Sequence, residues 1–232
     1  MSYSNWPNKT NDKTTALTDF FNKSHLLNSR QLKEEVFKRR LFFDRVAEVW
    51  EEEHRTAEPN HNLCRILQRM ELKPGQVVLD AGCGTGRLAP FILKKIGPEG
   101  KLIAVDVSAN MLKIARQKFN YHNLIFYQAD VCELEVSGLF DQVICLCLLP
   151  HLPDKELALR SFRKYLKAEG QFIIAHTTSR EEVNRYHAQL PEPICCDQLP
   201  ERPEMIKLLQ RTGFTMLELE ESDIYFLRAV SS

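Results

Sequence analysis

The chain has 232 residues, of which 44% are hydrophobic, and this is enough to bury the core of one large α/β domain. Its 31 basic residues balance its 31 acidic residues, so no overall positive charge favours nucleic acid or an anionic membrane. No stretch reaches the roughly 20 consecutive apolar residues of a membrane span, and residues 1–12 are polar and unlike a secretion signal. The seven cysteines show no metal-ligand spacing. Together these features predict a protein of the reducing cytoplasm.

Two helical patterns precede the first expected strand. Residues 1–28 are rich in polar side chains and predict a loosely ordered start that passes into a short helix. A long helical pattern begins at Ser29 and keeps its apolar side chains near one face. These side chains are Leu32, Val36, Phe43, Ala47 and Trp50. A second helical pattern, from Leu63 to Met70, ends before the turn Pro74-Gly75.

Beyond this turn, apolar runs with strand character alternate with helical stretches. The runs are Val77–Leu79, Leu102–Val105, Leu124–Tyr127, Gln142–Leu148 and Phe172–Ala175. The helices between them run from Leu88 to Ile96, from a cap at Ser108, and from a cap at Asp154 to a stop near Gly170. Strands that are apolar on both faces and separated by helices form a parallel sheet covered on both sides. The pattern therefore predicts a doubly wound α/β fold.

The end of the chain predicts a different pairing. A last helix runs from Pro203 to Gly213, with proline at its start and glycine at its end. Two final apolar runs, Thr215–Leu219 and Ile224–Val230, are joined by only Glu220-Glu221-Ser222-Asp223. A link this short cannot cross over to a parallel strand, so these two runs must form an antiparallel pair.

A glycine-rich loop leaves the first strand at its carboxyl end, where doubly wound sheets bind ligands. Gly82, Gly84 and Gly86 let the backbone turn sharply and approach a ligand, and they lead into a helix N-terminus that favours negative charge. A dinucleotide site has Gly-x-Gly-x-x-Gly at this place, but here the sixth position is Arg87. Asp80 ends the strand, where it would repel a pyrophosphate but could hold the cationic amino group of a methionine moiety. The loop thus favours S-adenosylmethionine over a nicotinamide cofactor.

Two more aspartates follow neighbouring strands at the same edge of the sheet. Asp106 ends the second strand, 20 positions after Gly86, where it could accept hydrogen bonds from both hydroxyls of a ribose. Its simpler role would be a negative charge near a helix N-terminus, although Ser108 is the better cap. Asp130 follows the third strand, within reach of an adenine amino group, but it could equally be an ordinary turn aspartate.

These segments together resemble the motif series of class I S-adenosylmethionine-dependent methyltransferases. The resembling segments are Val77 to Gly86, Leu102 to Met111, Phe126 to Val131, Phe140 to Asp154 and Leu166 to Ala175. The likeness spans residues 42–230 and is strongest to the branch of quinone-biosynthesis and other small-molecule methyltransferases. It implies a mostly parallel, seven-stranded Rossmann-like sheet whose last strand is inserted antiparallel beside the fifth.

The resemblance also implies a role for each residue of the cofactor site. Asp80 and the three glycines of the loop would cradle the methionine half. Asp106 would bind the ribose, and Asp130 with Val131 would bind the adenine. The predicted cofactor-binding residues are Asp80, Gly82, Gly84, Gly86, Asp106, Val107, Met111, Asp130, Val131, Leu146 and Cys147.

Several family signatures are missing from this sequence. After the fourth strand the chain reads Cys145-Leu146-Cys147-Leu148, not the Asn-Pro-Pro-Tyr type of signature found in enzymes that methylate amino groups of nucleic acid. The acidic metal cluster of catechol methyltransferases is also absent, so no metal is predicted. Many relatives have two histidines where this chain reads Pro150-His151.

Histidines and aromatic residues are the candidates for the acceptor side. His151 follows the fourth strand and His176 ends the fifth, and an imidazole at either place could act as general base near neutral pH. The alternatives are a capping His151 and a His176 that satisfies strand-end backbone groups. His187 is a weaker candidate that could instead be exposed. Phe43 and Trp50 resemble the segment that closes over the cofactor in this family, but they could simply be the buried face of their helix.

We therefore divide the chain into an N-terminal extension, residues 1–41, and a methyltransferase domain, residues 42–232. The extension is expected to be partly helical or disordered, and residues 177–201 of the domain form an insert that shapes the acceptor pocket. The predicted function is S-adenosylmethionine-dependent methyl transfer to a small molecule. Two alternatives are a protein methyltransferase, which an open groove would favour, and a non-catalytic Rossmann-like nucleotide-binding protein.

Overall fold

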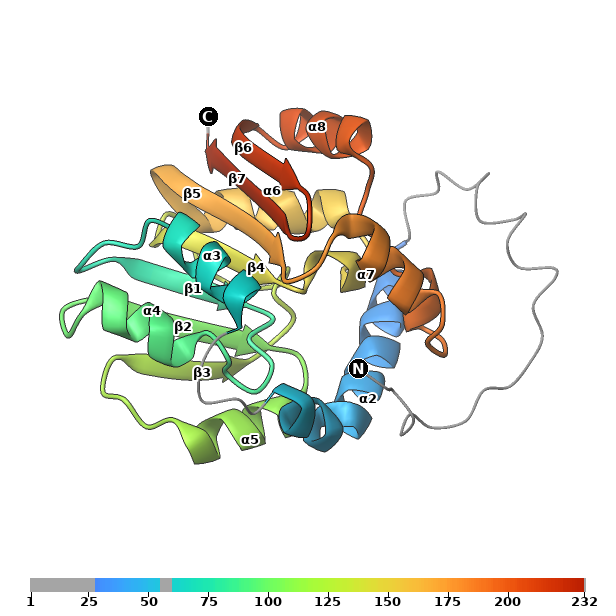
Figure 1. The fold of residues 1–232 in the computed structure, drawn as a ribbon, viewed down its shortest axis with the longest axis horizontal. Coiled ribbons are helices and arrows are strands. Elements are labelled where there is room, and N and C mark those ends of the chain that lie inside the picture. The colour runs from blue at the N-terminus through green and yellow to red at the C-terminus, as the bar shows by residue number, and fades with distance from the viewer. Residues whose placement is uncertain (1–27, 55–59, 232) are drawn as a thin grey trace, which may run out of the picture.

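The computed structural model describes residues 28–54 and 60–231, which form an α/β fold around one sheet (Figure 1). Its seven strands lie in the order β3-β2-β1-β4-β5-β7-β6. They are β1 (Val77–Ala81), β2 (Lys101–Asp106), β3 (Leu124–Gln128), β4 (Phe140–Leu146), β5 (Leu166–His176), β6 (Phe214–Glu221) and β7 (Tyr225–Ser231). Strands β1 to β5 pair in parallel, whereas β7 runs antiparallel between β5 and β6. This confirms the predicted doubly wound sheet and its antiparallel insertion.

The helices cover both faces of the sheet. They are α2 (Ser29–His54), α3 (His61–Arg69), α4 (Ala89–Ile96), α5 (Ala109–Lys118), α6 (Lys155–Tyr165), α7 (Arg180–His187) and α8 (Arg202–Arg211). Side chains alternate along a strand, so Leu102 and Ala104 of β2 pack with α3, α4 and α5 on one face. Val105 points to the other face, where α6 and α8 lie. Two buried layers therefore hold the sheet rigid behind the loops at its edge.

Two boundaries differ from the sequence prediction. The helix that begins after Asp154 ends at Tyr165, so the predicted stop near Gly170 is wrong. The reason is that Leu166 already has extended backbone dihedral angles and pairs with Phe140, which makes it the first residue of β5. Strand β4 ends at Leu146 and not at Leu148. The chain turns away from the sheet after Leu146, because the next residue, Cys147, has φ of 56°.

Helix α2 lies across the carboxyl edge of the sheet, beside α5 (Figure 1). Asp44 joins the two helices by accepting hydrogen bonds from the Ser108 hydroxyl at 2.6 Å and the Asn110 amide nitrogen at 3.1 Å. The helix continues without a break through residues 41 and 42, where we placed the start of the domain. The predicted extension before residue 28 lies outside the described residues.

Among the residues that the structure describes, none of the helices combines the length and the apolar character needed to span a membrane.

Candidate functional site

The loops at the carboxyl edge of the sheet surround a cavity of about 1030 Å³, which α2 covers. Ten of the eleven predicted cofactor-binding residues line it. These are Asp80, Gly82, Gly84, Asp106, Val107, Met111, Asp130, Val131, Leu146 and Cys147. Gly86 does not belong to the described lining of this cavity. The sequence motifs thus come together at one place, although they are spread over four strands.

The three glycines of the loop do different structural work. All three have positive φ, which glycine adopts at little cost. A Cβ at Gly84 would point toward open space, with its nearest neighbours, in Trp50 and Met111, at 3.9 and 4.0 Å. A Cβ at Gly86 would instead meet the Phe119 ring at 3.1 Å, so this glycine permits close packing of the loop on α5. Of these two glycines, only Gly84 leaves the backbone open to close approach by a ligand.

Asp80 presents an unpaired carboxyl group to the cavity. Its side chain is 1% exposed, and within residues 28–54 and 60–231 its Oδ2 atom has no hydrogen-bond partner. Burial, and then the nearby charge of Asp106, raises the pKa of Asp80 to about 8. A buried carboxyl group without a partner suits a ligand that brings a cationic amino group.

The aspartate at the end of β2 is anchored from both sides. Asp106 accepts a hydrogen bond from the backbone nitrogen of Gly84 on Oδ2 and from that of Ser108 on Oδ1, both at 2.8 Å. Burial raises its pKa to about 6. The Ser108 hydroxyl caps α5 as predicted, because it accepts from the Met111 nitrogen at 3.1 Å. Each Asp106 oxygen keeps a lone pair, so the carboxylate can hold the loop and also accept ligand hydroxyls.

Asp130 has the geometry of a turn aspartate and also lines the cavity. Its Oδ1 atom accepts a hydrogen bond from the Cys132 backbone nitrogen at 2.9 Å. The neighbouring Val131 is buried against the core. The two alternatives for Asp130 are thus compatible, since one oxygen holds the turn while the side chain stands at the cavity wall.

A second cavity of about 1170 Å³ adjoins the first and contains all the candidates for the acceptor side. Its lining includes His151, His176, His187, Phe43 and Trp50. Five residues line both cavities and therefore form the boundary between them. They are Phe43, Trp50, Arg87, Cys147 and His151.

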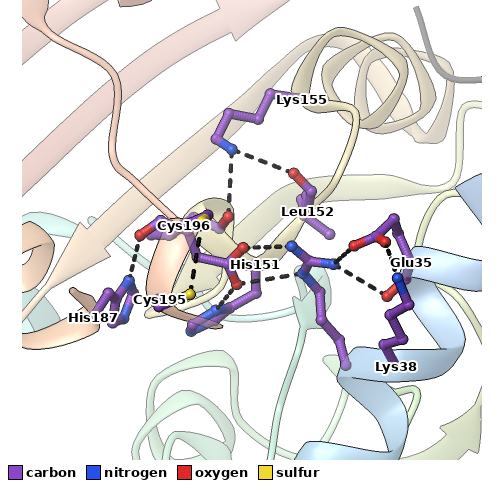
Figure 2. A network of polar contacts seen from close by, with 11 residues as sticks. Glu35, Lys38, His151, Leu152, Lys155, His187, Cys195 and Cys196 are labelled. Carbon is purple, nitrogen blue, oxygen red and sulfur yellow. Dashed lines mark hydrogen bonds and ion pairs between the residues drawn. The ribbon is translucent and has the colours of Figure 1, made fainter. Parts of the chain in front are cut away.

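His151 is held by a buried ion pair (Figure 2). Its Nδ1 atom lies 2.8 Å from Oδ2 of Asp197, whose side chain is only 3% exposed. The guanidinium of Arg39, on α2, donates to both oxygens of Asp197, at 2.5 and 3.3 Å. Although burial acts in the opposite direction, the hydrogen bonds from His151 and Arg39 lower the pKa of Asp197. Because a carboxylate only accepts, the proton of a neutral His151 sits on Nδ1 and Nε2 keeps its lone pair.

The other two histidines are buried and electrically neutral near pH 7. His187 is 6% exposed, so the alternative of an exposed histidine at this position is wrong. Its Nδ1 atom lies 2.7 Å from the Asp197 carbonyl oxygen. His176 is 3% exposed, and within the described part of the chain its Nε2 atom has no partner. Burial, together with the charge of His151, lowers the pKa of His176 to about 3 and that of His187 to about 4.

Three polar residues of this network were missed by the sequence prediction. Arg39 and Asp197 are 158 positions apart, so no local pattern links them. Lys155 donates to the carbonyl oxygens of Pro150 and Leu152 at 3.3 Å and so holds the turn that carries His151 (Figure 2). Burial lowers the pKa of Lys155 to about 8. A weak signal for Asp197 was available, because an aspartate stands inside the insert that we expected to shape the acceptor pocket.

No cluster of three or more histidine, cysteine, aspartate or glutamate side chains within residues 28–54 and 60–231 has the geometry to hold a metal ion. Cys195 and Cys196, next to Asp197, have their sulfur atoms 3.6 Å apart (Figure 2).

Comparison with known proteins identifies relatives across most of the chain. The family model described as "Methyltransferase domain" matches residues 72–224. The demethylmenaquinone methyltransferase of Staphylococcus carnosus is 27% identical over 169 residues, which cover 70% of each chain. The methyltransferase GfsG of Streptomyces halstedii is 26% identical, and the match covers 68% of this chain and 59% of that protein. A Staphylococcus aureus demethylmenaquinone methyltransferase is 30% identical, but the match spans only 48% of its length.

Solved structures share the fold at lower identity. A SAM-dependent methyltransferase from Aquifex aeolicus has a TM-score of 0.64 at 19% identity, with 78% of this chain and 98% of that chain covered. The magnesium protoporphyrin IX methyltransferase ChlM from Synechocystis, solved with bound SAH, also has a TM-score of 0.64 at 19% identity. That match covers 85% of this chain and 100% of the other. At this identity the likeness concerns the fold alone.

Proposed function

The chain belongs to the class I S-adenosylmethionine-dependent methyltransferases, and we propose that it methylates an acidic oxygen or carbon atom of a small aromatic molecule, with His151 as general base. The observation that supports this proposal best is the wall shared by the two cavities. His151, Phe43 and Trp50 stand there, between the cavity of the glycine loop and the cavity of the histidines. When bound, S-adenosylmethionine supplies an electrophilic methyl group on a sulfonium, which a nucleophile displaces in line.

The first cavity has the groups that this cofactor requires. Asp80 would ionise to hold the methionine amino group, and the open backbone at Gly84 leaves room for the chain that follows it. The free lone pairs of Asp106 would accept the ribose hydroxyls. Asp130 and Val131 would border the adenine. The remaining predicted residues that line this cavity, Val107, Met111, Leu146 and Cys147, complete the wall.

In the proposed mechanism, His151 Nε2 takes a proton from the acceptor. Asp197 stabilises the imidazolium that forms, since its carboxylate already lies 2.8 Å from Nδ1. The acceptor atom would then displace the methyl group that S-adenosylmethionine supplies when held by Asp80 and Asp106, and the sulfur would keep the electrons of the bond that breaks. Arg39 acts on His151 through Asp197, and Lys155 acts on it through the turn, so both are positioning residues.

A small acceptor is favoured over a protein by the walls of the second cavity. Phe42, Val183 and Ile194 are buried there, and Tyr186 adds a further aromatic ring to Phe43 and Trp50. Aromatic side chains on a mostly apolar wall suit a planar ring. The relative named for demethylmenaquinone supports the same class of acceptor at 27% identity.

The test is to follow a labelled methyl group from S-adenosylmethionine into an extract of the host cell that has been separated into small molecules and proteins. We expect label in an organic-soluble small molecule with the wild-type protein. The same reaction with the Gly84→Val variant is the control, since it removes the cofactor and keeps every other component. Label in the protein fraction alone would instead favour a protein acceptor. Cofactor binding without any labelled product would favour the non-catalytic alternative.

A further inference from the structure

Arg87 is a cation that stands at the boundary between the two cavities and has no partner among the described residues. Its side chain lines both of them and is half-buried. Within residues 28–54 and 60–231 no hydrogen bond or ion pair reaches its guanidinium group. Burial lowers the pKa of Arg87, yet a guanidinium remains charged at any physiological pH. The fold therefore holds an uncompensated positive charge at the place where methyl transfer is proposed to occur.

Arg39, which is buried, differs from Arg87 because its charge is paired. Arg39 donates to both carboxylate oxygens of Asp197 and to Glu35. The ionisable group that most affects Arg87 is Cys147, but burial raises the pKa of that thiol, so it stays neutral. Because a half-buried charge without a partner loses part of its hydration, a negative charge from a ligand would complete the site.

We propose that Arg87 binds a carboxylate group of the acceptor. This inference rests on the proposed function and names the class of substrate for the same site. It assigns Arg87 as a residue that determines specificity and touches the acceptor directly. A guanidinium offers a fork of N–H donors that matches the two oxygens of a carboxylate.

The position of the charge separates it from the methionine end of the cofactor site. Burial and then the charge of Asp106 raise the pKa of Asp80, and Arg87 is not among the groups that shift it. The carboxylate of methionine is bonded to the same carbon as its amino group, so a residue that binds it should lie near Asp80. Arg87 lines the first cavity with Asp80, but it also lines the second cavity with the aromatic rings of Phe43 and Trp50.

A second unpartnered group on the same cavity wall supports an oxygen-bearing acceptor. The buried Nε2 atom of His176 has no partner among the described residues and lines the second cavity together with Arg87. Its ring is neutral at physiological pH, so it can donate one hydrogen bond and accept another without adding charge. An aromatic acid with a neighbouring hydroxyl group would satisfy Arg87, His176 and His151 together.

The test compares two probes that differ only in charge, 1-hydroxy-2-naphthoate and 1-hydroxy-2-naphthamide. Calorimetry is performed on the full chain saturated with S-adenosylhomocysteine. We expect the wild type to bind the acid at least about tenfold more tightly, the lower end of what a charge-assisted hydrogen bond contributes. Arg87→Met should remove this preference, while Arg87→Lys should retain part of it. Arg160→Met, on the exposed side of α6, is the matched control and should leave it unchanged.

Three outcomes would overturn the inference. The first is equal affinity of the wild type for the acid and the amide, and the second is a preference that survives in Arg87→Met. Failure of the acid to bind at all counts against it in the same way. These results differ from failure of the proposed function, in which S-adenosylhomocysteine itself would not bind.

A fourth outcome concerns the source of the anion. The affinities of S-adenosylhomocysteine and 5′-methylthioadenosine, which lacks the amino-acid end, are compared in wild type and Arg87→Met. We expect the ratio of the two affinities to stay the same. If Arg87→Met weakens only S-adenosylhomocysteine, Arg87 binds the methionine carboxylate and not the acceptor.

Discussion

The cavity of the glycine loop and the cavity of the histidines are neighbours, but they are built in different ways. The first is formed by loops that directly follow β1, β2, β3 and β4 together with one face of α2, and its polar groups include backbone atoms and strand-end aspartates. The second is formed by α2, the ends of β4 and β5, and the insert that contains α7. The contact that holds His151 in the wall of this cavity joins Arg39 to Asp197, 158 positions away along the chain. A cofactor can be recognised by local strand-and-loop geometry, whereas acceptor recognition depends on distant segments.

The largest effect should come from closing the first cavity. We expect Gly84→Val nearly to abolish cofactor binding, because the side chain would enter the open space beside Trp50 and Met111. Calorimetry with S-adenosylhomocysteine measures the affinity, and thermal unfolding shows whether the fold persists. Gly75→Val is the matched control, since Gly75 also has positive φ but a Cβ there would contact nothing within 4 Å. Tight binding by Gly84→Val would mean that the ligand does not approach the loop.

For substitutions in the second cavity, we expect a large effect on rate without loss of cofactor affinity. We expect His151→Ala to reduce the single-turnover rate by about a hundred- to ten-thousandfold, the usual effect of removing a general base. His176→Ala is compared in parallel, because its unpartnered imidazole also lines the cavity. Normal rates in both variants would leave positioning alone as the mechanism.

Asp197 offers a sharper test of how His151 acts. Asp197→Asn keeps the size of the side chain but removes the charge that stabilises imidazolium, so the apparent pKa of the rate profile should fall. The measurement is single-turnover rate against pH for wild type and variant. If Asp197 only holds the fold together, stability will change and the pH profile will not.

A smaller effect is expected from the ribose site. Asp106→Ala should weaken S-adenosylmethionine binding by about 1.5 to 3 kcal/mol, because a charged acceptor loses its hydrogen bonds to the hydroxyls. The loop at Gly84 also loses an anchor, so the melting temperature of the variant without ligand must be measured beside its affinity. Unchanged affinity in a folded variant would contradict the assignment.

The smallest expected effect is the release of a proton when the ligand binds. Without ligand, Asp80 has a pKa of about 8 and is mostly protonated at pH 7. Binding of the ligand amino group would ionise Asp80, so binding should release close to one proton at pH 6 to 7 and strengthen toward pH 8. The raised pKa also means that unliganded stability falls as pH rises from about 4 through about 8, and Asp80→Asn should flatten this dependence. Calorimetry in buffers with different ionisation enthalpies detects the proton, and its absence would contradict the assignment.

The sequence predicted the fold and the cofactor because both depend on local patterns. Alternating strands and helices indicated the sheet, and Asp80 with the glycine loop distinguished S-adenosylmethionine from a nicotinamide cofactor. The stop of α6 was misplaced because strand pairing at Leu166 overrides the helical pattern that precedes it. Asp197 was missed because its significance depends on His151 and Arg39, which only the folded chain brings near. The roles of single residues in binding and catalysis, and the boundary at residue 42, stay predictions.

The position of α2 has a kinetic consequence. Phe43 and Trp50 of this one helix line both cavities, and Asp44 and Arg39 fasten the helix to α5 and to the insert. Both cavities are therefore bordered by the same element, and a movement of α2 away from α5 and the insert would widen both. We expect separation of α2 to limit steady-state turnover, with a rapid first turnover followed by a slower phase set by product release.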